Sequence, residues 1–174
     1  SNYALNLISQ TLRFNKLLKA WDKILVSIVE HHSNIVPWQI LAKESGVEMD
    51  VVKIDENFNL DLVDFEKKYD ENVKVVSLTQ VSNVTWQIFD LKCVKKLLRD
   101  DTLFIVDASQ SVPHFKVDVQ EIWADFVFFT AHKVMADSWI GVIWWKKELL
   151  EKFEPVFCWW WAINEVKENN YKSW

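Results

Sequence analysis

Glycine is nearly absent from this sequence. The 174 residues include 2 Gly and 11 Trp, whereas ordinary usage, with Gly at about 7% of residues, gives roughly twelve glycines for this length. Three of the tryptophans stand together at 159–161, in the stretch FCWWWAI. A chain that needs turns but has so little glycine requires an explanation, and we return to its tryptophans below.

Cysteine, basic charge and long apolar runs are also scarce. Cys93 and Cys158 show no metal-ligand spacing and no disulfide framework, which fits a reducing compartment. The net charge of −5 argues against a nucleic-acid-binding surface. No run reaches the 18 or so apolar residues that span a bilayer, and the first residues lack the basic and apolar regions of a signal peptide. Because half of the residues are hydrophobic, we predict a globular protein. From the cysteines, the charge and the lack of long apolar runs, we predict that it is cytoplasmic and binds neither nucleic acid nor membranes.

Apolar runs alternate with helical patterns along the whole chain. Strands are predicted at 23–29, 48–54, 73–79, 102–107, 125–130 and 140–145, and helices at 34–45, 60–69, 90–100 and 146–153. This alternation predicts βαβ units and a largely parallel sheet with helices on both faces. With no repeat and no linker, we expect one α/β domain over residues 1–174.

The chain starts without Met, directly on the helical pattern Leu5, Ile8, Leu12. We therefore expect a fragment of a longer protein, with an N-terminal segment and a C-terminal domain missing.

Polar residues follow four of the predicted strands. They lie at 30–32, 79–83, 107–110 and 130–133. Chemistry in such sheets gathers at the carboxyl ends of the strands. We therefore expect these segments to form one site.

Lys133 is the most informative of these residues, because it directly follows the hydrophobic run FVFFT. Desolvation at a strand end lowers the pKa of a lysine, so that its amine becomes a nucleophile able to form a Schiff base. Taken alone, a lysine in this position is more often one that extends to the surface.

Other polar residues suggest a bound pyridoxal phosphate. Asp107 is placed to pair with a pyridinium nitrogen, although an isolated aspartate at such a point often caps a turn. His31 could stack on a planar ring or serve as a structural histidine. Further candidates are Thr130 and His132 for the phosphate and Asn83 and Gln110 for the ring hydroxyl.

Four stretches carry a resemblance to a known family. They are VEHHSNIVPWQ (29–39), TQVSNVTWQ (79–87), VDASQSVPHFKVDVQ (106–120) and FFTAHKVMADSWIGV (128–142). Together they resemble the large domain of the class V aminotransferase-like cysteine desulfurases, of the sulfur-mobilising group that feeds iron–sulfur cluster assembly. The resemblance covers essentially the whole chain and implies a fold-type I domain with a mixed, mainly parallel sheet.

The resemblance also implies roles for individual residues. Lys133 matches the lysine that binds pyridoxal phosphate covalently, His31 the histidine stacked on the ring, and Asp107 the carboxylate on the ring nitrogen. The remaining matches are Asn83 and Gln110 near the hydroxyl, Thr130 and His132 at the phosphate, and Ser1 and Asn2 where the family has a Thr-Thr pair in its phosphate loop.

The activity implied is conversion of L-cysteine to L-alanine and an enzyme-bound persulfide, in a homodimeric parent that passes sulfur to an acceptor protein. The family's nucleophilic cysteine matches neither Cys93 nor Cys158, which we interpret as structural, so we expect this chain alone to be inactive. The alternatives are another class V enzyme, such as an aminotransferase or selenocysteine lyase, and a non-catalytic binding module or fragment of the same fold.

The resemblance offers an explanation for the tryptophans. Those at positions where similar proteins commonly have glycine are 21, 86, 123, 139, 145, 159, 160, 161 and 174. Trp38 and Trp144 occupy positions where an aromatic residue is normal. We interpret the nine as UGA codons that the source bacterium reads as glycine. The alternative is a genuine Trp-rich surface that binds a partner.

Overall fold

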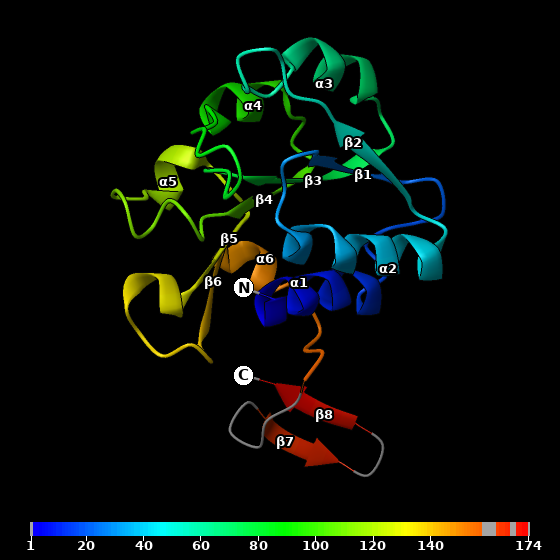
Figure 1. The fold of residues 1–174 in the computed structure, drawn as a ribbon. Helices are drawn as coiled ribbons and strands as arrows, with labels where there is room; N and C mark the ends of the chain where they lie inside the picture. The colour runs from blue at the N-terminus through cyan, green and yellow to red at the C-terminus, as the bar shows by residue number, and fades with distance from the viewer. Residues whose placement is uncertain (1, 158–162, 168–169, 174) are drawn as a thin grey trace.

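The computed structural model describes residues 2–157, 163–167 and 170–173, and its centre is a six-stranded sheet (Figure 1). The strands are β1 (Lys23–Ser27), β2 (Glu48–Val52), β3 (Val73–Thr79), β4 (Leu103–Asp107), β5 (Phe126–Thr130) and β6 (Gly141–Trp145). Their order in the sheet is β2-β1-β3-β4-β5-β6. The first five strands are parallel, and β6 runs antiparallel to β5. The predicted mixed, mainly parallel sheet is confirmed.

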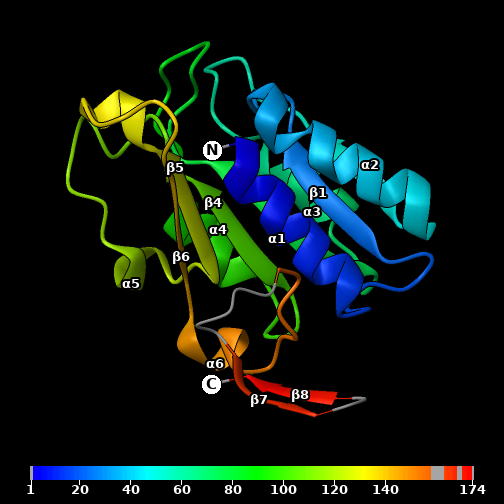
Figure 2. The same cartoon turned by 90° about the horizontal axis from the view of Figure 1, so that it is seen from below.

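Helices cover both faces of this sheet. They are α1 (Asn2–Phe14), α2 (Val36–Ser45), α3 (Leu62–Lys68), α4 (Leu91–Leu97), α5 (Val119–Ile122) and α6 (Lys147–Leu150), with short 3-10 helices η1 (His32–Asn34) and η2 (Ala131–Val134). Figures 1 and 2 show α1 and α2 side by side on one face and α3 and α4 on the other. Aspartates fix where α3, α4 and α5 begin, because Asp61, Asp90 and Asp118 each accept two backbone N–H bonds at the first turn.

The buried strands contribute to two cores, one under each helical layer. Successive side chains of a strand point to opposite faces, so Leu25 packs with the core beneath α3 and α4, while Ile24 and Val26 pack with the core beneath α1 and α2. Strands buried on both faces explain why the sequence shows continuous apolar runs there instead of an alternating pattern.

A short hairpin, β7 (Ile163–Lys167) and β8 (Asn170–Ser173), lies apart from the main sheet in both views (Figures 1 and 2). The sequence did not indicate these strands, because polar residues interrupt both runs. In the part of the chain that the structure describes, no helix combines the length and apolar character needed to cross a bilayer.

The strand order places a crevice at one edge of the sheet. After β1 the chain passes to α2 on one face, whereas after β3 it passes to α4 on the other face (Figure 1). Neighbouring strands whose connections diverge in this way leave room for a ligand outside their carboxyl ends. The fold therefore directs attention to the residues that follow β1 and β3.

Candidate cofactor site

A pocket of about 480 Å³ lies at the carboxyl ends of these strands. It brings together every site residue predicted from the sequence that the structure describes, namely Asn2, His31, Asn83, Asp107, Gln110, Thr130, His132 and Lys133. Ser1 lies outside the described residues. The pocket unites segments more than a hundred residues apart in the sequence.

Lys133 enters the pocket from η2, directly after β5, and its side chain is partly buried. Burial lowers the pKa of this lysine, while the negative charge of Asp107 opposes that shift. A lowered pKa increases the neutral fraction of the amine, which is the form that attacks a carbonyl carbon.

Asp107 ends β4 and is buried, with 4% of its surface exposed. Burial raises its pKa, and the side chain and backbone N–H of Ser109 and the charges of Lys133 and His31 oppose the increase. The Ser109 N–H donates to Asp107 Oδ1 over 2.8 Å. A cation placed beside this carboxylate would favour its charged form.

His31 lies at the end of the loop after β1 and caps η1. Its Nδ1 accepts the backbone N–H of Ser33 over 3.1 Å and lies 2.7 Å from Ser33 Oγ. Because a backbone N–H can only donate, Nδ1 is the acceptor, and Nε2 carries the proton of the neutral ring. The Ser33 contacts therefore set both the orientation and the tautomer of the imidazole.

Thr130 and His132 form a pair beside Lys133, with Thr130 Oγ1 2.8 Å from His132 Nδ1. Thr130 is buried and His132 is exposed. On the far side of the pocket, Asn2 stands at the start of α1, where unpaired backbone N–H groups favour an anion.

Several pocket residues had been given no individual role. Thr79, Val81 and Ser109 belong to the segments 79–83 and 107–110 that we expected at the site, whereas the others lie outside the expected segments: Tyr3, Ser33, Ser138, Trp139, Ile140 and Gly141. The last four arrive because β6 is antiparallel to β5, so that Gly141 pairs with Thr130 and the preceding loop lies beside the carboxyl end of β5.

Comparison with known proteins shows the family of this chain. The model of the class-V aminotransferase family matches residues 1–173. The chain belongs to the class-V aminotransferase family. The chain is 39% identical over 171 residues to a Pyrococcus abyssi protein described as a "Probable cysteine desulfurase". The alignment covers 97% of this chain and 42% of that relative.

Solved structures of class-V enzymes have the same fold. The cysteine desulfurase CsdA from Escherichia coli superimposes with a TM-score of 0.92 at 28% identity, covering 99% of this chain and 43% of that one. The apo cysteine desulfurase of Thermococcus onnurineus gives a TM-score of 0.89 at 35% identity, with the same coverage. The chain thus spans less than half the length of the class-V relatives that it matches.

The residues present fit pyridoxal phosphate. The pocket offers a partly buried lysine of lowered pKa and a buried carboxylate, and polar groups stand at the start of a helix. The hydroxyl of Ser109 is buried at the pocket wall, close enough to Asp107 to lower the pKa of that carboxyl, yet it makes no hydrogen bond of good geometry within the described chain. A buried polar atom of this kind is costly unless a ligand or water satisfies it.

Proposed function

We propose that this chain is the cofactor-binding part of a pyridoxal phosphate-dependent cysteine desulfurase, which converts L-cysteine to L-alanine and a protein-bound persulfide. The observation that carries the proposal is the meeting of Lys133, Asp107 and His31 in one pocket at the carboxyl edge of the sheet. Membership of the class-V family and two desulfurase relatives of the same fold support it.

The residues have distinct tasks in this proposal. Pyridoxal phosphate, when bound, supplies a conjugated ring that takes up the electron pair released at the substrate α-carbon. Lys133 Nζ would hold the cofactor covalently and would accept the α-proton of the substrate. The Asp107 carboxylate would pair with the ring nitrogen, and the His31 ring would stack on the cofactor ring.

The other polar residues would hold the ends of the cofactor. Thr130 and His132 would donate to the phosphate, and Asn83 and Gln110 to the ring hydroxyl, as the resemblance implies. Ser1 and Asn2 would complete the phosphate site. The first four are assigned from their match to the family pattern, whereas Ser1 and Asn2 depart from the Thr-Thr pair of its phosphate loop and are assigned from their position alone. Those the structure describes line one pocket.

Cys93 is unsuited to accept sulfur from the substrate. It is exposed on α4 and donates its S–H to Asp90 Oδ2 over 2.9 Å. This hydrogen bond raises the pKa of the Cys93 thiol, whereas a nucleophilic cysteine needs a lowered pKa. Cys158 lies outside the described residues. We infer that another cysteine of the whole protein takes the sulfur, in a cytoplasmic homodimer that passes it to an acceptor protein of iron–sulfur cluster assembly.

The test uses the protein expressed from its complete gene. Pyridoxal phosphate is added, and sulfide and alanine are measured after addition of L-cysteine and a reductant. We expect equal amounts of sulfide and alanine. Keto-acid formation with amino transfer would indicate an aminotransferase, and turnover restricted to selenocysteine would indicate a selenocysteine lyase. Failure to bind the cofactor would leave only the non-catalytic alternative.

A further inference from the structure

A buried carboxylate lies beneath the pocket without lining it. Glu30 stands between β1 and His31 and is 6% exposed. We propose that Glu30 is a positioning residue, which fixes His31 relative to Asp107 by joining the ends of β1 and β3. This inference rests on the proposed function, because it assigns Glu30 a part in the same reaction.

Three donors meet at the Glu30 carboxylate, each from a different segment. Oε1 accepts the hydroxyl of Ser27 over 2.6 Å and the backbone N–H of Thr79 over 2.9 Å. Oε2 accepts the side-chain amide of Asn34 over 2.6 Å. One carboxylate thus connects the end of β1, the end of β3 and the segment that leads into α2.

Asn34 extends the network to the loop that carries His31. Its Oδ1 accepts Ser77 Oγ over 2.6 Å and Trp38 Nε1 over 3.3 Å, so its amide nitrogen must face Glu30. Its backbone N–H donates to the carbonyl of His31 over 2.7 Å. His31 is therefore held between Glu30, its neighbour in the chain, and Asn34, which Glu30 binds.

Thr79 links the same carboxylate to the strand of Asp107. Thr79 pairs with Asp107 in the register of β3 and β4, and the next backbone N–H, that of Gln80, donates to the Asp107 carbonyl over 2.9 Å. Since β1 and β3 are the strands whose connections diverge, Glu30 joins the two sides of the crevice. The distance between His31 and Asp107 depends on the hydrogen bonds of Glu30 to Thr79 and Asn34.

Glutamine cannot replace Glu30 in this network in either orientation of its amide. If Nε2 takes the place of Oε2 it meets the Asn34 amide donor, and if it takes the place of Oε1 it meets the Thr79 N–H. A protonated glutamate can adapt, because the Ser27 hydroxyl can turn and accept. Glu30→Gln therefore preserves size but breaks the joint.

Glu30 is also electrically coupled to the pocket. Burial raises its pKa to about 7, hydrogen bonds from Ser27, Thr79 and Asn34 oppose the shift, and the charge of Asp107 adds to it. Asp107 in turn faces Lys133 and His31. Removing the Glu30 charge favours ionised Asp107 and hence a protonated amine at Lys133.

The experiment compares Glu30→Gln with Glu66→Gln, an exposed glutamate on α3, in the protein expressed from its complete gene. Affinity of the apoprotein for pyridoxal phosphate, the pH midpoint of the absorbance of the lysine-bound cofactor, and kcat and KM for L-cysteine are measured. For Glu30→Gln we expect weaker cofactor binding, a higher midpoint, and kcat lowered about 10- to 100-fold with a smaller change in KM. Glu66→Gln should match the parent protein.

Two results would overturn the inference. A Glu30→Gln protein that melts at lower temperature but keeps the midpoint, the cofactor affinity and kcat would make Glu30 merely structural. A parent protein that never fixes the cofactor would instead refute the proposed function, and this inference with it. If Glu30→Gln does not fold, Ser27→Ala decides, because it removes one donor and should shift the same readouts less; unchanged readouts there would overturn the inference.

Discussion

Charged side chains gather at both ends of the central sheet, but they meet different surroundings there. At the amino end, Lys23 binds Asp70 and Lys74 binds Asp101, with all four side chains partly exposed. The hydrogen bond from each lysine lowers the pKa of its aspartate. These groups have their partners within the chain.

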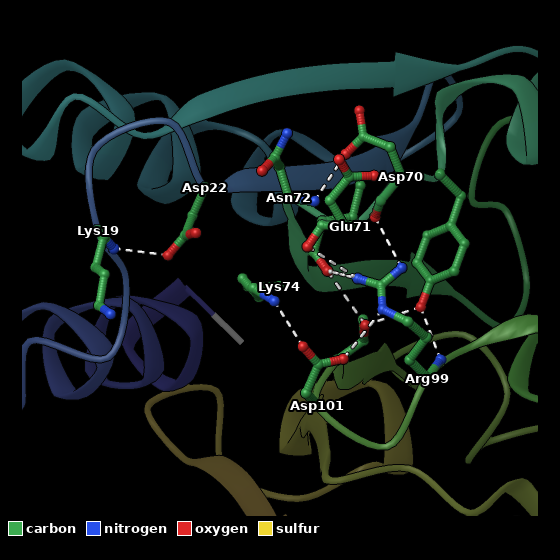
Figure 3. A network of polar contacts seen from close by, with 11 residues as sticks. Lys19, Asp22, Asp70, Glu71, Asn72, Lys74, Arg99 and Asp101 are labelled. Carbon is green, nitrogen blue, oxygen red and sulfur yellow. Dashed lines mark hydrogen bonds and ion pairs between the residues drawn. The ribbon is translucent and has the colours of Figure 1, made fainter.

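Arg99 is the centre of the amino-end network (Figure 3). Its guanidinium donates to three backbone carbonyls, those of Asp70, Glu71 and Val73, and to the Asp101 carboxylate. It also lies 4.8 Å from the centre of the Tyr69 ring. These hydrogen bonds connect the segment that carries Arg99 to the loop before β3 and to the start of β3.

At the carboxyl end, burial raises the pKa of both Glu30 and Asp107 and lowers that of Lys133. The buried Ser109 hydroxyl there lies near Asp107 but makes no hydrogen bond of good geometry in the described chain. Perturbed groups of this kind concentrate where a ligand completes the electrostatics. The charges at the amino end are thus paired with one another, whereas Asp107 and Lys133 at the carboxyl end face the pocket.

The strongest test of this difference is the removal of the pocket lysine. Lys133→Ala should abolish the yellow absorbance of the lysine-bound cofactor and its fixation by borohydride, because no other amine replaces Nζ. The matched control is Lys43→Ala, an exposed lysine on α2. Cofactor fixed by borohydride to another lysine in Lys133→Ala would contradict the assignment.

The next largest effect concerns the pH dependence of stability. Glu30 has a pKa of about 7 in the fold against an ordinary value of 4.5, so its contribution to the free energy of unfolding is fully present below about pH 4.5. That contribution is lost as pH rises through about 7. Its size is on the order of 3 kcal/mol. The stability difference between the parent and Glu30→Gln, from urea denaturation, should fall by about this amount between about pH 4.5 and 8.

Asp107 also has a raised pKa, and because its charge is coupled to that of Glu30, the pH dependence of this difference belongs to the pair of carboxyls. A difference that stays constant across the pH range would show that Glu30 titrates normally. It would also remove the contrast between the two ends of the sheet.

At the amino end the expected effect is smaller and confined to stability. Arg99→Met removes four charged hydrogen bonds at a partly exposed site and should lower the free energy of unfolding by about 1–2 kcal/mol, leaving cofactor affinity unchanged. Lys92→Met breaks only the exposed pair with Glu121 and should change the free energy of unfolding less than Arg99→Met does. A change in cofactor affinity in either variant would show that the two ends are coupled.

The sequence predicted which residues meet in the pocket better than it predicted the hydrogen bonds beneath them. Lys133 and Asp107 were identifiable because a parallel sheet brings the residues after its strands to one edge, and β3 was predicted over its full length. The Glu30 network was not, because its partners Ser77 and Thr79 lie more than 40 residues away in the sequence. Contacts of that kind depend on strand register, which hydrophobic patterns alone do not specify across a parallel sheet.

The tryptophans also divide by region. Trp38 is fully buried and donates to Asn34. Left-handed backbone occurs at six non-glycine residues of the described chain, Lys16, Trp21, Phe58, Trp86, Trp123 and Met135. Trp21, Trp86 and Trp123 are all exposed.

Trp123 ends α5 in the conformation in which Gly46 ends α2. Trp145 differs, since it packs against Phe126 with ring centres 5.7 Å apart. Trp159–161 and Trp174 lie outside the described residues, and the interpretation of nine tryptophans as glycine codons stays a prediction.

Replacing single tryptophans by glycine tests that prediction. An L-residue in the left-handed region costs about 1–2 kcal/mol. Glycine avoids this steric cost but loses more backbone entropy on folding, which offsets part of the gain. Trp→Gly at 21, 86 or 123 should therefore raise the free energy of unfolding by about 1 kcal/mol each. Trp38→Gly is the matched control and should lower it by about 3–5 kcal/mol, because it leaves a buried cavity. Denaturant unfolding of the protein from its complete gene measures both, and the gene should read UGA at the three turns and UGG at 38. UGG at the turns, or lower stability in the Trp→Gly variants, would refute the glycine interpretation and favour a genuine tryptophan surface on these turns.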